Sequence, residues 1–137
     1  MTRKQAQFSL AFLFRALADP TRLRILNLIG DREICVCYFV EILSLSQPKI
    51  SRHLAYLRRA GIVSARREGK WIHYRLSIPK DEVAAVILRE TVKHLGARHE
   101  MQRDTARLAS ACCQPKRFEL LQAAPQPQEI EVVGGPG

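Results

Sequence analysis

One stretch, Ser44 to Gly61 (SLSQPKISRHLAYLRRAG), restricts the fold more than any other part of the chain. Ser46 can cap the free amide groups at the start of a helix, and Pro48 suits the first turn because it lacks an N–H. Apolar residues then recur at i, i+4 and i+7, which gives one stripe for burial. They are Ile50, Leu54 and Leu57. The stretch therefore predicts an amphipathic helix over Gln47–Ala60.

The polar face of this helix carries side chains that can donate hydrogen bonds to phosphates or base edges. They are Gln47, Lys49, Ser51, Arg52 and His53. The formal net charge of the chain is +9, and the excess lies entirely in residues 1–76, since acidic and basic residues balance from Ser77 onward. A solvated basic face is the alternative, but basic residues along one helix face favour a polyanion partner. We therefore expect a recognition helix that binds double-stranded DNA.

The segments before it complete a helix-turn-helix. Helices are predicted over Gln5–Leu17, from Asp19-Pro20 to Gly30-Asp31, and over Cys37–Leu43, with a brief strand at Ile34–Val36. The last of these helices meets the recognition helix through the turn Ser44-Leu45-Ser46. In such a pair the second helix enters the major groove of DNA.

After Gly61 the apolar period changes from 3.6 to 2, which predicts a β-hairpin. Its strands are Ile62–Arg67 and Lys70–Leu76, joined by the two-residue turn Glu68-Gly69. Basic residues gather near the tip: Arg66, Arg67 and Lys70. An ordinary hairpin with a soluble tip is the alternative. Its position directly after the recognition helix favours a wing that contacts the DNA backbone or minor groove.

A long amphipathic helix is predicted from Pro79 onward, and Gly96 can interrupt it. The composition changes at Gln114, where Pro and Gly become frequent, so we expect a mobile tail. We therefore divide the chain into a DNA-binding and dimerisation domain, residues 1–110, and a segment with a cysteine pair and a flexible tail, residues 111–137. No apolar run approaches the roughly 20 residues that span a bilayer, and the start lacks a signal cleavage site. We expect a cytoplasmic protein without a membrane partner.

The four cysteines form two pairs, Cys35 with Cys37 and Cys112 with Cys113. In a reducing cytosol such pairs are more often metal or redox sites than structural disulfides. Adjacent cysteines bridge only with strain, and the spacing gives no CxxC zinc framework. Buried apolar thiols are the alternative for both pairs.

Four segments, in this order, resemble the ArsR/SmtB family of bacterial metal-sensing repressors, most closely its arsenic-responsive branch. They are LADPTRLRIL (Leu17–Leu26), ICVC (Ile34–Cys37), SQPKISRHLAYLRRAGIV (Ser46–Val63) and EGKWIHYRL (Glu68–Leu76). The resemblance covers about residues 8 to 95. It implies a mostly α fold with a small β-hairpin, a winged helix-turn-helix homodimer built through its first and last helices. Such a repressor binds a palindromic operator and releases it when a thiophilic ion binds.

The arsenic-responsive branch typically places three cysteines around the third helix, in a form resembling CVCxxC. Here Cys35 and Cys37 stand, but Val40 occupies the third position. The inducer expected from the resemblance is As(III) or Sb(III), held by thiolates because both are thiophilic. Arsenite can exchange three hydroxyls for sulfur and a monomethylated form only two, so an isolated pair favours an organoarsenical or a weaker two-sulfur site. A third thiolate would have to come from Cys112 or Cys113, and only a helix break near Gly96, or the other protomer, would bring it near. Some members of the family resemble sensors with a C-terminal pair of adjacent cysteines, so the whole site could instead lie at Cys112 and Cys113.

Other functions remain open at this point. A thiol-redox-sensing repressor could use the same cysteines. A thiol enzyme using Cys112 and Cys113 lacks an oxyanion- or phosphate-binding loop and a base placed by motif, so we do not expect an enzyme. Zinc is not expected either, because His94 and His99 would point about 140° apart on a helix. His53 and His73 are expected to be DNA-side or packing residues.

Overall fold

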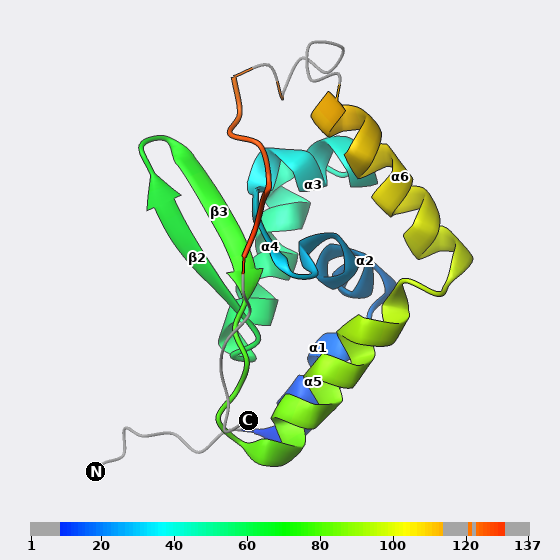
Figure 1. Ribbon diagram of the computed structural model, residues 1–137. Coiled ribbons are helices and arrows are strands. Elements are labelled where there is room, and N and C mark those ends of the chain that lie inside the picture. The colour runs from blue at the N-terminus through cyan, green and yellow to red at the C-terminus, as the bar shows by residue number, and fades with distance from the viewer. Residues whose placement is uncertain (1–8, 114–120, 122, 131–137) are drawn as a thin grey trace.

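The computed structural model describes residues 9–113, 121 and 123–130 of the 137-residue chain. The elements in order are α1 (Leu10–Leu17), α2 (Pro20–Ile29), β1 (Arg32–Cys35), α3 (Val36–Leu43), α4 (Gln47–Arg59), β2 (Val63–Glu68), β3 (Trp71–Leu76), α5 (Glu82–Leu95), α6 (His99–Cys113) and β4 (Gln128–Glu129). The β2–β3 hairpin lies on one side of the helical body and α6 on the opposite side (Figure 1). The chain thus forms a winged helix-turn-helix, as predicted.

Side-chain caps set the helix starts. The Asp19 carboxylate accepts a hydrogen bond from the Arg22 backbone N–H at 3.0 Å, and Pro20 follows in the first turn. Ser46 caps α4 through the Lys49 N–H at 3.4 Å, and the predicted stripe of α4 is fully buried. These starts confirm the sequence prediction. The expected beginning of the first helix at Gln5 lies outside the described residues, and α1 begins after its cap Ser9.

The strands form one antiparallel sheet in the order β2-β3-β1-β4. β1 pairs with β3 so that Cys35 is opposite His73. The brief strand predicted at Ile34–Val36 is present but begins two residues earlier, at Arg32, and ends at Cys35 because Val36 already begins α3. The hairpin is confirmed, but its turn lies one residue later than predicted: Glu68 pairs with Trp71, so the turn residues are Gly69 and Lys70. Gly69 has the positive φ, 60°, that such a two-residue turn requires. The sequence does not predict β4, which pairs with the outer edge of β1.

The long C-terminal helix is interrupted where Gly96 predicted. α5 and α6 meet at residues 96–98, and α6 folds back against α2 and α3 (Figure 1). The Arg24 guanidinium fixes α6 to α2, since it donates to both carboxylate oxygens of Asp104 at 2.7 and 2.9 Å. The end of α6, with Cys112 and Cys113, is thereby brought to α3.

Most large apolar side chains are buried in one core, but four stay exposed on α1 and α5. They are Leu10, Phe14, Val83 and Val86. None of the helices in the described part of the chain is long and apolar enough to cross a membrane. Most of the tail that we expected to be mobile lies outside the described residues.

Candidate nucleic-acid interface and thiol site

The α4 helix presents its polar face to solvent, because the opposite face carries the buried stripe. Gln47, Lys49, Ser51 and Arg52 are exposed. His53 is half-buried: its Nδ1 lies 3.4 Å from Arg22 Nη1, and burial lowers the pKa of its imidazole. Four of the five residues predicted to contact DNA on this helix are therefore free to reach a partner, whereas His53 packs against α2.

A groove of about 320 Å³ runs beside α4 and adds a cation that the sequence did not single out. Arg22 lines it together with Lys49 and Arg52. The Arg22 guanidinium lies 4.0 Å from the centre of the Tyr56 ring and donates to the Ala16 backbone carbonyl at 2.9 Å. These contacts hold Arg22 beside the recognition helix. Its sequence signal was only a positive charge three residues after a helix cap, which does not distinguish it from other surface arginines.

The hairpin tip also carries basic side chains in solvent, and one of them forms an ion pair with β1. Arg67 and Lys70 are exposed. Arg66, which we predicted to contact DNA, is exposed, and its guanidinium binds the Glu33 carboxylate of β1 at 2.6 Å. Arg75 reaches the same carboxylate at 3.3 Å. Arg66 therefore ties the hairpin to β1 within one chain.

The first thiol pair lies where β1 meets α3. The Cys35 side chain is fully buried and Cys37 is half-buried, and the two sulfurs are 3.1 Å apart. The Cys37 thiol donates a hydrogen bond that lowers the pKa of Cys35 to about 6 and raises its own pKa. The charge of His73, opposite on β3, also lowers the pKa of Cys35. This pair is therefore primed to hold one thiolate near neutral pH.

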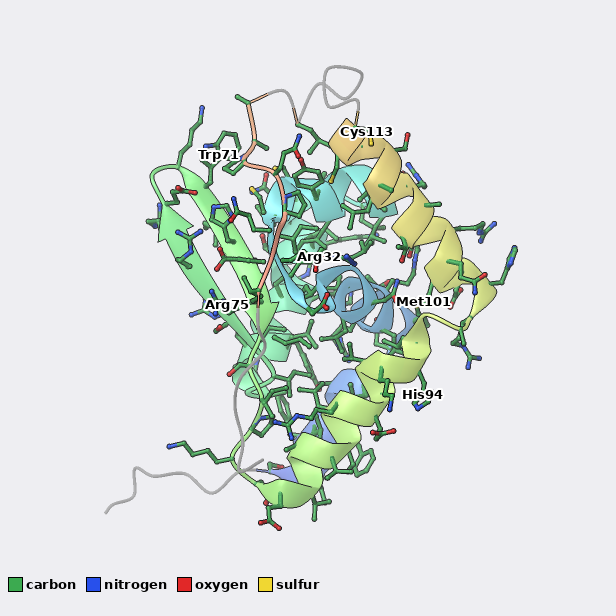
Figure 2. The ribbon with its side chains drawn as sticks, viewed as in Figure 1. Arg32, Trp71, Arg75, His94, Met101 and Cys113 are labelled. Atoms are coloured by element: carbon green, nitrogen blue, oxygen red, sulfur yellow. The ribbon has the colours of Figure 1, made fainter. Side chains whose placement is uncertain are left out.

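The second pair lies at the end of α6, where Figure 2 labels Cys113. Cys113 is exposed and Cys112 is half-buried, and burial raises the pKa of Cys112. Tyr38 on α3 is within electrostatic reach of both pairs: burial raises its pKa to about 12, and the charges of Cys112, Cys37 and Cys35 act in the same direction. Its hydroxyl is buried, and hydrogen bonding with the Cys112 side chain also contributes to the raised pKa of Tyr38.

The two pairs do not form one ready site. Among residues 9–113, 121 and 123–130, no three Cys, His, Asp or Glu side chains gather around a position that could hold a metal ion. The structure places Cys35 beside Cys37 and carries Cys112 to the same end of the molecule. The Tyr38 side chain lies close enough to interact with both pairs. Tyr38 had no sequence signal beyond its place in an apolar helix.

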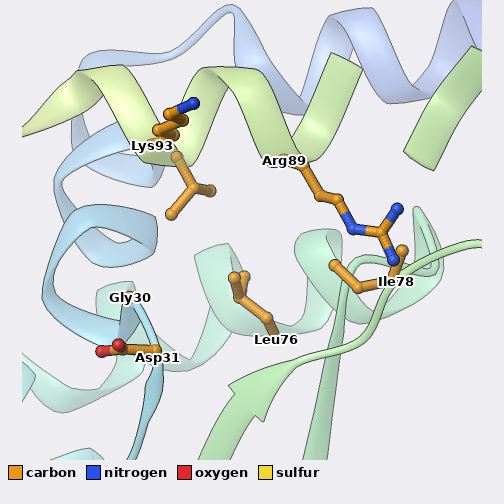
Figure 3. A pocket seen from close by; sticks show the side chains of 7 residues that line it. Gly30, Asp31, Leu76, Ile78, Arg89 and Lys93 are labelled. Atoms are coloured by element: carbon orange, nitrogen blue, oxygen red, sulfur yellow. The ribbon is translucent and has the colours of Figure 1, made fainter. Parts of the chain in front are cut away.

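A pocket of about 310 Å³ connects the first pair with the DNA-binding elements. It is lined by Val36, Cys37, Val40, Gln47, Lys70, Trp71 and Ile72, which come from α3, the start of α4 and the hairpin. Trp71 stands on the hairpin side of the molecule (Figure 2). A second pocket, of about 410 Å³, lies under α5, and Figure 3 shows Arg89 reaching from this helix toward Ile78. Its described lining contains no thiol.

Comparisons with known proteins agree with this architecture. Residues 19–65 match the family model described as bacterial regulatory protein, arsR family. The chain is 52% identical to the arsenical resistance operon repressor of Escherichia coli over 79 residues, which are 57% of this chain and 68% of that relative. It is 57% identical over 65 residues to the arsenic resistance transcriptional regulator ArsR1 of Pseudomonas putida, covering 47% of this chain and 51% of that relative. Among solved structures, it is similar to a homodimeric winged helix-turn-helix DNA-binding domain from Mycobacterium bovis, with a TM-score of 0.50 and 31% identity, covering 65% of this chain and 83% of that one.

The Glu33 contacts predict a specific dependence of stability on pH. Arg66 holds the pKa of Glu33 below its ordinary value of 4.5, so the contribution of this carboxylate to stability is complete above that value. It is lost as the pH falls through the lower native pKa. We therefore expect Glu33→Gln to lower the Tm at neutral pH, and the difference from the wild type to shrink as the pH is lowered below about 4.5.

Thermal unfolding over a pH series at one protein concentration measures this difference. Glu129→Gln is the matched control, because Glu129 is an exposed glutamate of the same sheet. A Tm difference for Glu33→Gln that stays constant across the series would contradict the ion-pair account.

Proposed function

The chain belongs to the arsR family of bacterial regulatory proteins, and we propose that it is an operator-binding repressor released by trivalent arsenic or antimony. Proteins of this family are DNA-binding transcriptional regulators and not enzymes. The observation that carries the proposal is the position of the Cys35–Cys37 pair. Its sulfurs lie 3.1 Å apart at the start of α3, the helix that leads directly into the recognition helix.

The proposed DNA-binding surface joins α4, the groove beside it and the hairpin tip. Gln47, Lys49, Ser51 and Arg52 would reach base edges or phosphates, with Arg67 and Lys70 on the backbone beside them. The half-buried His53 and the Glu33-bound Arg66 would support this surface. A regulator of this class acts in the cytoplasm, where its operator lies.

The proposed assembly is a homodimer on a palindromic operator. Its support is the exposed apolar surface of α1 and α5, where Phe14 and Val86 are 52% and 59% exposed. The similar domain from Mycobacterium bovis is homodimeric. Because half-sites on DNA have a fixed spacing, a dimer whose recognition helices shift loses contacts at both half-sites together.

The proposed switch couples the thiols to this spacing. A thiophilic ion that draws Cys35 and Cys37 onto one centre acts on the junction of β1 and α3. The short turn after α3, where Ser44 has a left-handed backbone (φ 55°), passes a movement of α3 to α4. A coupling free energy of about 1 to 3 kcal/mol, typical of allostery, would lower DNA affinity by about 5- to 150-fold.

A redox switch is the second candidate, favoured by the same short sulfur–sulfur distance and the lowered pKa of Cys35. In that case a peroxide would oxidise the two thiols to a disulfide and itself be reduced to water. Both candidates place the trigger at the start of α3. They differ in whether arsenic alone, under reducing conditions, releases the operator.

Arg52→Ala is expected to weaken operator binding by about 1 to 3 kcal/mol while arsenic binding is retained, because its exposed side chain lies on the proposed reading face. Fluorescence anisotropy with labelled operator DNA measures the loss. Arg103→Ala is the charge-matched control, since Arg103 is exposed on α6, on the side of the molecule away from the hairpin. Equal losses for both variants would indicate that only net charge matters and would contradict the proposed docking.

Cys35→Ser and Cys37→Ser are each expected to repress normally but to abolish operator release by arsenite and methylarsenite, because each removes one of the two adjacent sulfurs. Operator release is titrated under strictly reducing conditions, with Cys113→Ser, an exposed thiol, as the control. A normal arsenical response in the Cys35 and Cys37 variants would move the sensor to α6. If peroxide releases the wild-type operator and arsenite does not, the redox candidate replaces the arsenic one.

A further inference from the structure

We propose that the Cys35–Cys37 pair and its adjoining pocket form a site selective for monosubstituted trivalent organoarsenicals with a bulky apolar substituent, such as an aryl group. The inference rests on the proposed arsenic-responsive function and specifies its ligand class. Two sulfurs would hold the arsenic atom, and the 310 Å³ pocket would hold the substituent. We call this space the substituent pocket.

The number of sulfurs at the site determines how many hydroxyls of an arsenical can be exchanged. The two sulfurs are 3.1 Å apart, within the span of two bonds of about 2.3 Å to one centre, the length of a typical metal–thiolate bond. A third thiol is absent from the pocket: Val40 follows Cys37 by one helical turn, and both line it. Val40 therefore presents an isopropyl group to the pocket where a cysteine at this position would place a thiol.

Burial limits the side from which a reagent can reach the two sulfurs. The Cys35 side chain is fully buried, whereas Cys37 lines the pocket. A reagent that bridges both sulfurs must therefore approach from the side of Cys37. A group attached to the bridging atom would then project into the substituent pocket, between α3 and the hairpin.

The size and lining of the substituent pocket suit an apolar group. Its walls include three aliphatic side chains and one indole: Val36, Val40, Ile72 and Trp71. A volume of about 310 Å³ is at the lower end of the range for small-molecule sites. A hydroxyl of arsenite would leave this space to water, whereas an aromatic ring could pack on the half-exposed Trp71 and the aliphatic side chains.

The reaction needs no oxidant. A monosubstituted arsenical R–As(OH)₂ exchanges its two hydroxyls for the two sulfurs. Two As–O bonds break and two As–S bonds form. One hydroxide leaves as water with the Cys37 thiol proton and the other, displaced by the Cys35 thiolate, takes a proton from solvent, so arsenic stays trivalent and keeps its bond to carbon. The substituent would also touch Gln47, the first residue of α4, and Lys70 of the hairpin turn. A bulky group in the pocket therefore acts on both DNA-binding elements at once.

The test uses the full chain and three probes: phenylarsonous acid, methylarsonous acid and arsenite. Binding is followed by the fluorescence of Trp71, the single tryptophan of the chain, and operator release by anisotropy. Val40→Phe fills the substituent pocket and Val40→Cys adds a third sulfur. Operator binding by each variant without arsenical verifies that it is folded.

We expect Val40→Phe to weaken phenylarsonous acid binding by about tenfold or more and methylarsonous acid binding by much less, because only the larger substituent needs the pocket. Val40→Cys is expected to strengthen arsenite binding by a similar factor. Equal losses of the two organoarsenicals in Val40→Phe, or phenyl and methyl forms of equal affinity in the wild type, would overturn the substituent pocket.

The two proposals fail separately. Tight, Val40-dependent binding of phenylarsonous acid without operator release would overturn the proposed function and retain the site. Operator release by arsenite as readily as by phenylarsonous acid, with unchanged binding in Val40→Phe, would retain the function and overturn the selectivity.

Discussion

The buried carboxylate of Glu33 is the contact on which the arrangement of reader, wing and thiols depends. It lies two residues before Cys35 on β1 and receives the guanidinium groups of Arg66 and Arg75 from the two hairpin strands. A buried charge is retained only when it is paired, so this carboxylate fixes where the hairpin crosses β1. Because β1 ends at Cys35, the first thiol of the pair, the wing and the proposed sensor share one strand. A change at the sulfurs has a short mechanical path to the wing through β1 and to the recognition helix through α3.

The second anchor is the return of α6, which Arg24 and Asp104 hold against α2. It brings Cys112 to the surroundings of Tyr38, a buried phenol on α3 whose pKa the Cys112 side chain helps to raise. The two thiol pairs thus occupy one end of the molecule without sharing a centre. The α3 pair adjoins the pocket, whereas Cys113 of the α6 pair is exposed, which is why the proposed sensor is the α3 pair.

Local signals in the sequence predicted the elements, because caps, stripes and two-residue turns act over a few positions. The Ser46 cap, the stripe of α4 and the break at Gly96 correspond to the structure, and the hairpin turn lies one residue later than predicted. The short strand β4 and the pairing of Arg66 with Glu33 were missed, since both depend on contacts between residues far apart in the chain. The same holds for the pocket: Val40 was noticed as a missing cysteine, but only the fold shows that Trp71 stands beside it.

The central claim is that the α3 pair alone holds the inducer. X-ray absorption at the arsenic edge, on the full chain loaded with one equivalent of arsenite under reducing conditions, counts the sulfurs around arsenic directly. The account predicts two sulfurs and one oxygen in the wild type, unchanged in Cys112→Ser and Cys113→Ser. Three sulfurs in the wild type, falling to two in Cys112→Ser, would contradict it and place the third thiolate on α6.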